Sequence, residues 1–359
     1  MLYKLGQLVK YSSNKINTNN LNPSTYISTE NMLPNIQGIV KSSNVPENIN
    51  VCKFENSNIL LSNIRPYFHK LYFPTFTGGC SNDVLCFNVI DSQLTLPKYL
   101  YYMMSTTSFI DYVVSTSKGT KMPRGDKNAI LDYTFNVVPF DQQLLIVDII
   151  GSIDDKIENN NKIIEKFNKF LKIKTNELLL YKTTKIQLND IIEECKEKTD
   201  IELTPYSVVN TGKVIIQNEQ FNKEIAKNIK GKYKKIKKDF FVYNPSRINI
   251  GSIGMMEDKI GCVSPIYIVF KCDVEYKIYL QQLLTFEFMI KEINKRCSGS
   301  VRQALPFKDL CSIEIYDIER DKLKLYNKYC ENIIKTIKKL EEENLKLQQL
   351  KNNYLAKFF

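Results

Sequence analysis

Few side chains in this sequence of 359 residues have the types and spacing that catalysis needs. Its single histidine, His69, cannot form a histidine-based metal site, and no spacing singles out a serine and an aspartate to complete a Ser-His-Asp triad. The glycines at 78–79 and in the segment 251–254 lack the spacing of phosphate-binding loops. The sequence therefore predicts no catalytic residue and no metal site, and we expect His69 to be a polar residue of a strand.

Three other features have simple structural explanations. The Asn-Pro-Ser segment at 244–246 lacks the second proline and the aromatic residue of an amino-methyltransferase box. Asp154 and Asp155 lie in an expected helix, where a solvated face is the simplest environment for carboxylates. The nine cysteines are odd in number, contain no Cys-x-x-Cys pair and lie mostly in apolar runs, which predicts reduced, buried thiols.

Basic residues give the first indication of a ligand. The net charge of +11 favours association with polyanions through counterion release. A composition rich in Asn, Ile and Lys can also reflect an A·T-rich genome, so the charge alone leaves nucleic-acid binding open. The lysine-rich segment 223–240 is either a solvated charge run or an element that follows phosphates, and its interleaved Tyr233 favours the second interpretation.

The candidate DNA contacts lie in expected loops or beside expected strands, in two similar sets. Arginine is the side chain best suited to bind O6 and N7 of guanine. The candidates are Arg65, His69, Lys118, Lys121, Arg124, Lys232, Lys234, Lys235, Arg247, Lys295, Arg296 and Arg302.

Two long helices must position these sets. Apolar residues recur at alternating steps of four and three, first from Ile146 and again near the end of the chain, which is typical of paired helices. The first seam is Ile146, Ile150, Ile153, Ile157, Asn160, Ile164, Phe167, Leu171, Lys174 and Leu178. The second seam is Leu323, Tyr326, Cys330, Ile333, Ile337, Leu340, Asn344, Leu347, Lys351, Tyr354 and Phe358.

The order of elements is repeated, which indicates an internal duplication. Residues 4–10 are echoed by 187–193, and Gly119 matches Gly299 at an offset of 180. We therefore predict an α+β protein with two similar β-rich modules, separated by two long helices that form an antiparallel coiled coil. The expected boundaries are 1–140 for the first module, 141–182 for the central helix, 183–319 for the second module and 320–359 for the C-terminal helix.

The connectivity favours antiparallel pairing of the helices, because each module stands between the end of one helix and the start of the next. A helix of about 40 residues is about 60 Å long, so this pairing would place the modules at opposite ends. Asn160 and Asn344 would then meet in a register whose partner numbers add up to about 504. A buried pair of asparagines can fix the register of two helices at some cost in stability.

The chain resembles the specificity (S) subunits of type I restriction-modification systems over nearly its whole length. The likeness lies in NILLSNIRPY at 58–67, in the segment 119–164 that begins GTKMPRGDK, in the segment 239–271 that begins DFFVYNPSRINIGSIG, and in the weaker echo GSVRQALPFKDLCSIEI at 299–315. The Pro-x-x-x-Gln step into the first helix, from Pro139 to Gln143, is especially typical. The second copy departs from this pattern, because it has YDIERDK instead.

The resemblance implies a non-catalytic reader of double-stranded DNA. In this family each target-recognition domain binds one half of a bipartite site, and the paired helices fix the gap. Two methyltransferase (modification) subunits dock on the chain, and we assign Pro139, Gln142 and Gln143 to that contact; restriction subunits can join them. S-adenosylmethionine would belong to the modification subunits, since this chain carries no cofactor motif of its own and methylation requires a flipped base in a pocket.

Two other classes of function stay open at this stage. One is a coiled-coil scaffold whose modules bind proteins, and absence of salt-dependent retention on duplex DNA would favour it. The other is a self-contained nuclease or methyltransferase, which would bind S-adenosylmethionine by itself. The sequence contains no apolar run of the roughly 20 residues that a membrane span needs, and no signal-peptide pattern, so we expect a soluble cytoplasmic protein without a membrane partner.

Overall fold

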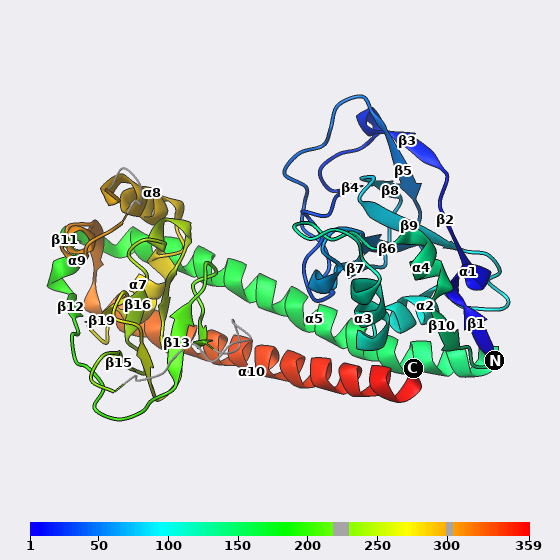
Figure 1. Cartoon of the computed structure of the whole chain (residues 1–359). Coiled ribbons are helices and arrows are strands. Elements are labelled where there is room, and N and C mark those ends of the chain that lie inside the picture. Colours follow the sequence, from blue (N-terminus) through cyan, green and yellow to red (C-terminus); the bar gives the residue numbers. More distant parts are fainter. Residues whose placement is uncertain (218–229, 299–303) are drawn as a thin grey trace. The chain divides into compact units, whose positions relative to one another are not determined.

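The computed structural model describes residues 1–217, 230–298 and 304–359 of the chain (Figure 1). It divides the chain into two compact units, and each contains a β-rich module with a segment of both long helices. Unit 1 consists of Met1–Asn161 and Glu341–Phe359, and unit 2 consists of Lys162–Leu340. None of the helices in the described residues is long and apolar enough to cross a bilayer.

Unit 1 is built from two four-stranded sheets and a two-stranded ribbon. The first sheet has the order β2 (Val9–Tyr11), β9 (Val84–Val89), β6 (Ile59–Ser62), β7 (Leu71–Tyr72). The second has the order β3 (Lys15–Asn17), β5 (Asn50–Phe54), β8 (Gly78–Cys80), β4 (Tyr26–Ile27). The ribbon pairs β1 (Leu2–Lys4) with β10 (Thr134–Asn136).

Short helices complete the core of unit 1. They are α1 (Leu5–Leu8), α2 (Pro97–Met104), α3 (Thr107–Ser115) and α4 (Lys127–Asp132). The sequence pattern predicts one helix from Pro97 to Ser115, but the structure has two. The reason is Thr106, whose backbone is extended and whose hydroxyl accepts a hydrogen bond from the N–H of Phe109, so that it caps a new helix.

Unit 2 has the same composition of elements. One sheet has the order β12 (Ile192–Glu194), β19 (Ile268–Cys272), β16 (Phe241–Tyr243), β17 (Ile253–Met255). The other has the order β14 (Val214–Ile216), β13 (Pro205–Val208), β18 (Ile260–Val263), β15 (Lys234–Lys237). The remaining elements are the pair β11 (Lys182–Gln187) and β20 (Glu314–Ile318), with α7 (Lys277–Leu283), α8 (Glu287–Arg296) and α9 (Phe307–Cys311).

The predicted duplication is present in the contacts of the two units. In both, a tyrosine of the helix after the first sheet donates its hydroxyl to the ribbon: Tyr99 to the carbonyl of Asn136 at 3.4 Å, and Tyr279 to that of Tyr316 at 3.1 Å. Donors and acceptors are both 180 residues apart. The second sheets differ at both edges, because the fourth strand of unit 1, β3, lies beside β5, whereas that of unit 2, β14, lies beside β13, the counterpart of β4.

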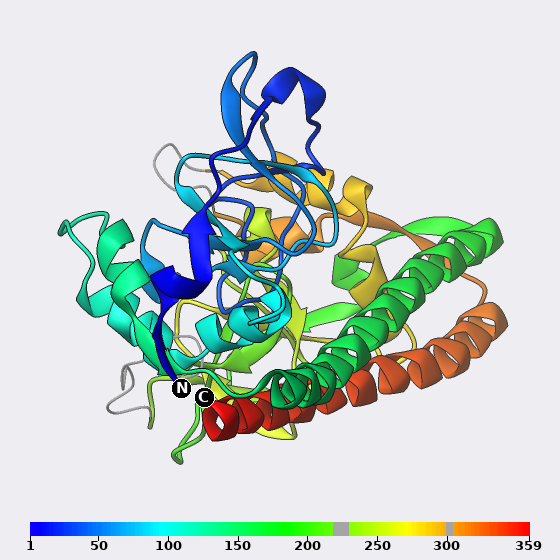
Figure 2. The ribbon, with the colours of Figure 1, turned by 90° about the vertical axis from the view of Figure 1, so that its right-hand side faces the viewer.

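The long helices are α5 (Phe140–Leu178) and α10 (Arg320–Phe358), each of 39 residues. In each unit their segments lie side by side (Figures 1 and 2). In unit 1 the amide Nδ2 of Asn160 donates to Oδ1 of Asn344 at 2.9 Å, the pairing that the predicted register requires. In unit 2 the hydroxyls of Thr175 and Tyr326 are 2.8 Å apart. Within each unit the segments of α5 and α10 are therefore antiparallel.

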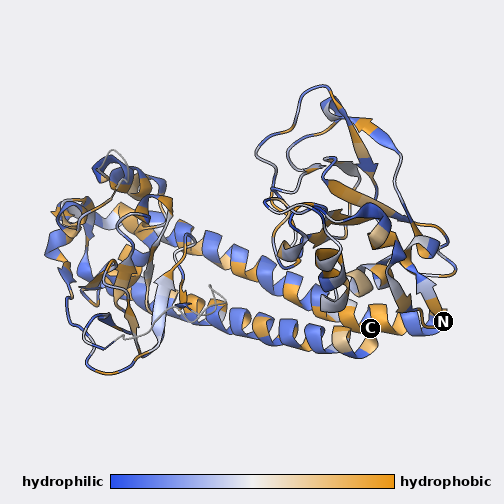
Figure 3. Ribbon diagram, in the orientation of Figure 1, coloured by the Kyte–Doolittle hydropathy of each residue, from blue (hydrophilic) through white to orange (hydrophobic). Residues whose placement is uncertain are grey.

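Apolar residues recur along both helices between hydrophilic ones (Figure 3). The apolar residues nearer the ends of the helices, Ile146, Ile150, Leu171 and Leu323, are buried, whereas Ile157, Ile164, Phe167, Ile333, Ile337, Leu340 and Leu347 are half-buried. Asp154 does not lie on a solvated face as the sequence suggested. Its carboxylate accepts a hydrogen bond from the Tyr102 hydroxyl at 2.9 Å and pairs with the Lys351 ammonium at 2.6 Å.

Candidate nucleic-acid interface

In unit 1 a short 3-10 turn, η2 (Pro66–Phe68), follows β6. Arg65 precedes this turn and His69 ends it, and both have left-handed backbones with φ of 49° and 51°. Residues other than glycine rarely adopt this backbone conformation. The exposed rings of Tyr67 and Phe68 stand between the two polar residues.

A closed loop lies beside this turn. Lys118 and Arg124 exchange backbone hydrogen bonds of 2.8 Å, and Arg124 also bridges to Ile64. The N–H of Arg65 donates to the carbonyl of Pro123 at 2.8 Å. The structure thus brings together five predicted contacts, Arg65, His69, Lys118, Lys121 and Arg124. With Tyr67, Phe68 and Met122, they form what we call the loop-turn surface of unit 1.

Two cations of this surface form exposed ion pairs with carboxylates. Arg124 pairs with Asp83 at 3.2 Å, and Lys118 pairs with Asp126 at 2.5 Å; both cations are more than half exposed. The Lys118 ammonium holds the pKa of the Asp126 carboxyl below its usual range. Exposed ion pairs contribute little stability, so a phosphate can replace either carboxylate at small cost.

His69 behaves differently from the lysines and arginines around it. It is half-buried, and burial lowers its pKa, although the Asp111 carboxylate acts in the opposite direction. A histidine with a lowered pKa is neutral at pH 7, so its ring can both donate and accept hydrogen bonds. In this position His69 is suited to contact a base edge rather than to attract phosphate.

Unit 2 repeats the scaffold of this surface. Arg247 precedes the 3-10 turn η5 (Ile248–Ile250), which follows β16 as η2 follows β6. Ser298 and Ala304 exchange backbone hydrogen bonds at an offset of 180 from Lys118 and Arg124. The loop-turn surface of unit 2 therefore has a serine and an alanine where unit 1 has two cations. Arg302 and Gly299 lie outside the described residues.

The lysines of unit 2 lie elsewhere than expected. Lys234 and Lys235 belong to strand β15 rather than to a loop. The ammonium of Lys234 donates to the carbonyl of Tyr267 at 2.6 Å, and burial lowers its pKa, so its role is internal. Lys235 pairs with Glu197 at 2.8 Å, and Lys232 is exposed. No contact of the described residues joins these lysines to Arg247. The predicted phosphate-following element at 223–240 lies partly outside the described residues.

Two further candidates lie on helix α8. Lys295 is exposed in its last turn. Arg296 instead forms an ion pair with Glu292 and donates to the hydroxyl of Ser312 at 3.0 Å, which fixes α8 to the segment before β20. The guanidinium of Arg296 is therefore a structural brace, and the expectation that it contacts DNA has no support in its surroundings.

Reasoning from the sequence missed the apolar part of the loop-turn surface of unit 1. Tyr67 is 49% exposed, Phe68 37% and Met122 47%. Aromatic rings beside arginine are suited to pack on sugars, base faces and thymine methyl groups. The signal was available in the string RPYFHK, where two aromatic residues follow an arginine directly.

The residues expected to dock a modification subunit separate into two classes. Gln143 is fully buried. Its amide donates to the carbonyls of Leu94 and Val138 at 3.1 and 3.0 Å and accepts from the N–H of Leu96 at 2.9 Å. The side chain of Gln143 is therefore bound within unit 1 and offers no surface to a partner. Pro139 and Gln142 are exposed.

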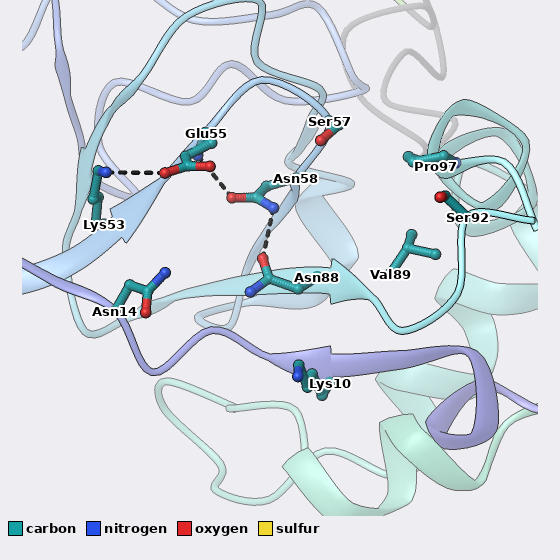
Figure 4. A pocket seen from close by; sticks show the side chains of 10 residues that line it. All are labelled: Lys10, Asn14, Lys53, Glu55, Ser57, Asn58, Asn88, Val89, Ser92 and Pro97. Atoms are coloured by element: carbon teal, nitrogen blue, oxygen red, sulfur yellow. Dashed lines mark hydrogen bonds and ion pairs between the residues drawn. The ribbon is translucent and has the colours of Figure 1, made fainter.

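A polar pocket of about 310 Å³ lies apart from the loop-turn surface (Figure 4). Lys53 and Glu55 form an ion pair of 2.9 Å on its wall, and Asn58 donates to Asn88 at 2.6 Å. Asn58 precedes β6, whereas Arg65 follows this strand, so the pocket lies at the opposite end of the sheet. None of its lining residues belongs to the predicted DNA contacts.

All nine cysteines are free, and six of them are buried, as the sequence predicts. Among the described residues, no group of three or more His, Cys, Asp or Glu side chains is arranged to hold a metal ion.

Comparison with known proteins relates the first part of this chain to a family. The family model of the type I restriction modification DNA specificity domain matches residues 1–169. The type I restriction enzyme HindI specificity subunit of Haemophilus influenzae is 27% identical over 170 residues, which are 45% of this chain and 36% of the relative. The chain thus aligns with little more than a third of that relative.

A solved structure extends the likeness of fold to the whole chain. The S subunit of a type I restriction-modification system from M. genitalium is 14% identical, with a TM-score of 0.60 over 100% of this chain and 96% of that one. At this identity the likeness concerns the fold alone. Residues 1–169 match the type I restriction modification DNA specificity domain, and the whole chain shares its fold with that solved S subunit.

Proposed function

We propose that this chain is the DNA-reading subunit of a type I restriction-modification complex, and that each unit reads one half of a bipartite site. The observation that carries the proposal is the repeated loop-turn surface. Each unit has an arginine before a 3-10 turn and, close to it in the structure, two residues that exchange backbone hydrogen bonds. Two copies of one reading surface on a single chain suit a target with two specified parts.

The two long helices would set the unspecified gap between those parts. A helix of 39 residues is about 58 Å long at 1.5 Å per residue, which is comparable to 10 to 20 base pairs of duplex at about 3.4 Å each. Target-recognition domains at 1–140 and 183–319, with 141–182 and 320–359 as spacers, remain our assignment. Its support is that α5 and α10 begin 180 residues apart.

The chain would leave the chemistry to its partners. We infer that it is not itself an enzyme, and that two modification subunits bring S-adenosylmethionine and the methyl-transfer site. Restriction subunits would join where the system contains them, and the complex would act on cytoplasmic DNA. The support is that no predicted site residue forms a nucleophile-base pair in the described contacts, while the basic residues gather around the turn of unit 1.

A groove in unit 2 is a candidate for docking a modification subunit, together with Pro139 and Gln142. It has a volume of about 340 Å³ and lies between the end of α5 and the start of α10. Leu325 is 67% exposed and Tyr329 50%, beside the ammonium groups of Lys174 and Lys322. Apolar and aromatic surface rimmed by cations is suited to an amphipathic partner with acidic residues.

The test is methylome sequencing of a host that expresses the chain with its modification subunit. We compare the wild type with Arg65→Ala, Arg247→Ala and the control Lys166→Ala, which removes an exposed cation of α5. Loss of one good contact to a base lowers discrimination by about 1–3 kcal/mol, or roughly fivefold to 150-fold. We expect Arg65→Ala to relax one half-site and Arg247→Ala the other, with an unchanged gap.

Other outcomes would contradict the proposal in distinct ways. Relaxation of both half-sites by one variant would mean that the units do not read separately. Methylation by the chain without its partner would contradict the non-catalytic assignment. Unaltered half-sites in both variants would remove the loop-turn surfaces from the reading of DNA.

A further inference from the structure

The duplication creates a problem of partner choice for the long helices. Both have 39 residues, and they begin at Phe140 and Arg320, exactly one repeat of 180 apart. Because of this equivalence, α5 of one chain could pair with α5 of a second copy in the same antiparallel geometry. The same holds for α10 with α10. Apolar seams alone would allow all of these pairings.

A partly buried ion pair breaks the equivalence in unit 1. The Lys351 side chain is 9% exposed and its ammonium lies 2.6 Å from the carboxylate of Asp154, which also accepts from Tyr102. One repeat away, the equivalent positions in unit 2 are Leu171 and Ile334. Both belong to the apolar core of unit 2.

A buried hydrogen bond breaks the equivalence in unit 2. Thr175 is fully buried and Tyr326 is 7% exposed, and their hydroxyls are 2.8 Å apart. The equivalent positions in unit 1 are Leu355 and Ile146, which are both buried in its apolar core. Polar and apolar pairs therefore exchange places between the units.

The amide pair follows the same rule. Asn160 is 1% exposed and donates to Asn344 and to a carboxylate oxygen of Glu343, each at 2.9 Å. One repeat away stand Ile164 and Leu340. These three polar pairs are thus matched between α5 and α10 and unmatched between equivalent positions.

Pairing of like helices would mismatch every one of these contacts. Two α5 helices would set Asp154 against Leu171, Asn160 against Ile164 and Thr175 against Ile146. Two α10 helices would set Lys351 against Ile334, Asn344 against Leu340 and Tyr326 against Leu355. A buried charge or amide without its partner is far more costly than a pair of apolar side chains.

We propose that these three polar pairs are partner-selecting residues: they specify the pairing of α5 with α10 and exclude pairing of like helices between two copies of the chain. They act by penalising the wrong partner rather than by strengthening the right one. The inference concerns assembly and does not depend on what the chain reads.

The direct test makes the seam of unit 1 symmetric. The variant Asp154→Ile, Asn160→Leu, Asn344→Ile, Lys351→Leu installs the residues found one repeat away. Mixtures of 14N- and 15N-labelled full-length chains, unfolded and refolded together, are cross-linked and analysed by mass spectrometry. We expect α5–α5 cross-links of mixed isotope composition to rise about tenfold or more over the wild type. No rise in a folded variant would overturn the proposal.

A second test holds even if the symmetric variant does not fold. Lys351→Asp and Asp154→Lys chains, with different tags, each carry like charges within the chain but are complementary to each other. Coexpressed, they should co-purify as a two-chain species in which α5 of each meets α10 of the other. The chain with both reversals should remain a single-chain species, like the wild type.

The matched control reverses exposed charges on the same helices, Asp155→Lys with one tag and Lys346→Asp with the other. These chains should not co-purify. The proposal fails if the Lys351→Asp and Asp154→Lys chains co-purify no more than this control. It also fails if two differently tagged wild-type chains co-purify as strongly as the Lys351→Asp and Asp154→Lys chains.

Discussion

The two units share one scaffold and differ in the chemistry of the surface that it presents. In unit 1 the loop beside the turn is closed by Lys118 and Arg124, and the turn exposes two aromatic rings. In unit 2 the equivalent bridge joins Ser298 and Ala304, and the turn exposes Ile250. The order of the elements is kept, but Arg65 is left-handed with φ of 49° whereas Arg247 has φ of −139°, and the side chains that could touch a ligand have changed. Such a pair of surfaces is suited to two different half-sites.

The same contrast runs through the buried contacts. Where unit 1 uses a polar residue to join its parts, unit 2 has an apolar one at the equivalent position, and the reverse also occurs. Gln143 clamps the loop before α2 in unit 1, whereas the equivalent Leu323 of α10 is buried in apolar surroundings. We therefore expect substitutions at equivalent positions to change the stability of the two units by different amounts.

The largest expected effect on stability distinguishes the interface of α5 and α10 in unit 1 from that in unit 2. Asp154→Ala removes the carboxylate that pairs with the Lys351 ammonium, on a side chain that is 9% exposed and lies 5.6 Å from the centre of the Tyr102 ring. Removing one member of a buried pair costs about 3 kcal/mol of unfolding free energy. Urea unfolding followed by circular dichroism measures the loss, and Asp155→Ala, at an exposed neighbour, should change the unfolding free energy by less than about 0.5 kcal/mol. If the loss of unfolding free energy equals that of the control, the Lys351 ammonium is hydrated in the variant.

The next effect concerns the residue that ends each 3-10 turn. Gly251 ends the turn of unit 2 with φ of 92°, and a Cβ there would lie 2.3 Å from the carbonyl oxygen of Asn210. Gly251→Ala should destabilise the protein by about 2 kcal/mol or more, from left-handed strain together with the clash. Gly231→Ala is the control, since its φ is 73° with no atom near the added Cβ, and it should cost only about 1 kcal/mol. Equal losses would show that the clash is relieved.

A smaller effect tests the loop-turn surfaces as phosphate binders. Lys118→Ser gives unit 1 the residue found at Ser298 of unit 2. If Lys118 contacts a phosphate, the slope of log affinity against log salt should fall by about 0.9, with roughly tenfold weaker binding at 0.1 M salt. The reciprocal Ser298→Lys should steepen the slope. Fluorescence anisotropy of the complex with its modification subunits on duplex DNA measures both, and unchanged slopes would exclude this loop from the contact.

Much of this comparison could be predicted from the sequence, because it depends on order and spacing. The duplication, the two helices and the contact of Asn160 with Asn344 follow from heptad positions and a constant offset. Asp154 could not be placed, because its partner Lys351 is 197 residues away and nothing local marks the carboxylate as buried. The predicted DNA contact of Lys234 has the same difficulty, because tertiary packing places the carbonyl of Tyr267 that accepts its hydrogen bond.

The candidate surface was predicted in part. Arg65 and Arg124 were found because arginines beside strands and after helices suit a DNA contact. That they meet at one surface depends on the bridge of Arg124 to Ile64, which no pattern in the sequence indicates. The family resemblance supplied the function, while the side-chain roles of Gln143 and Arg296 came only from their neighbours.

The smallest effect returns to the end of the turn, where unit 1 has His69 at the place of Gly251. His69→Gly should relieve left-handed strain of about 1–2 kcal/mol, offset by about 0.5–1 kcal/mol of chain entropy, so a net gain within about 1 kcal/mol is expected at pH 7. Burial lowers the pKa of His69 below its ordinary value of 6.5. The folded state therefore binds fewer protons than the unfolded state in this window, so wild-type stability is full above pH 6.5 and falls as the pH drops through the lowered pKa. Urea unfolding between pH 5 and 8 should show a weaker pH dependence in the variant, and an identical pH dependence would mean that His69 titrates as it does in the unfolded chain.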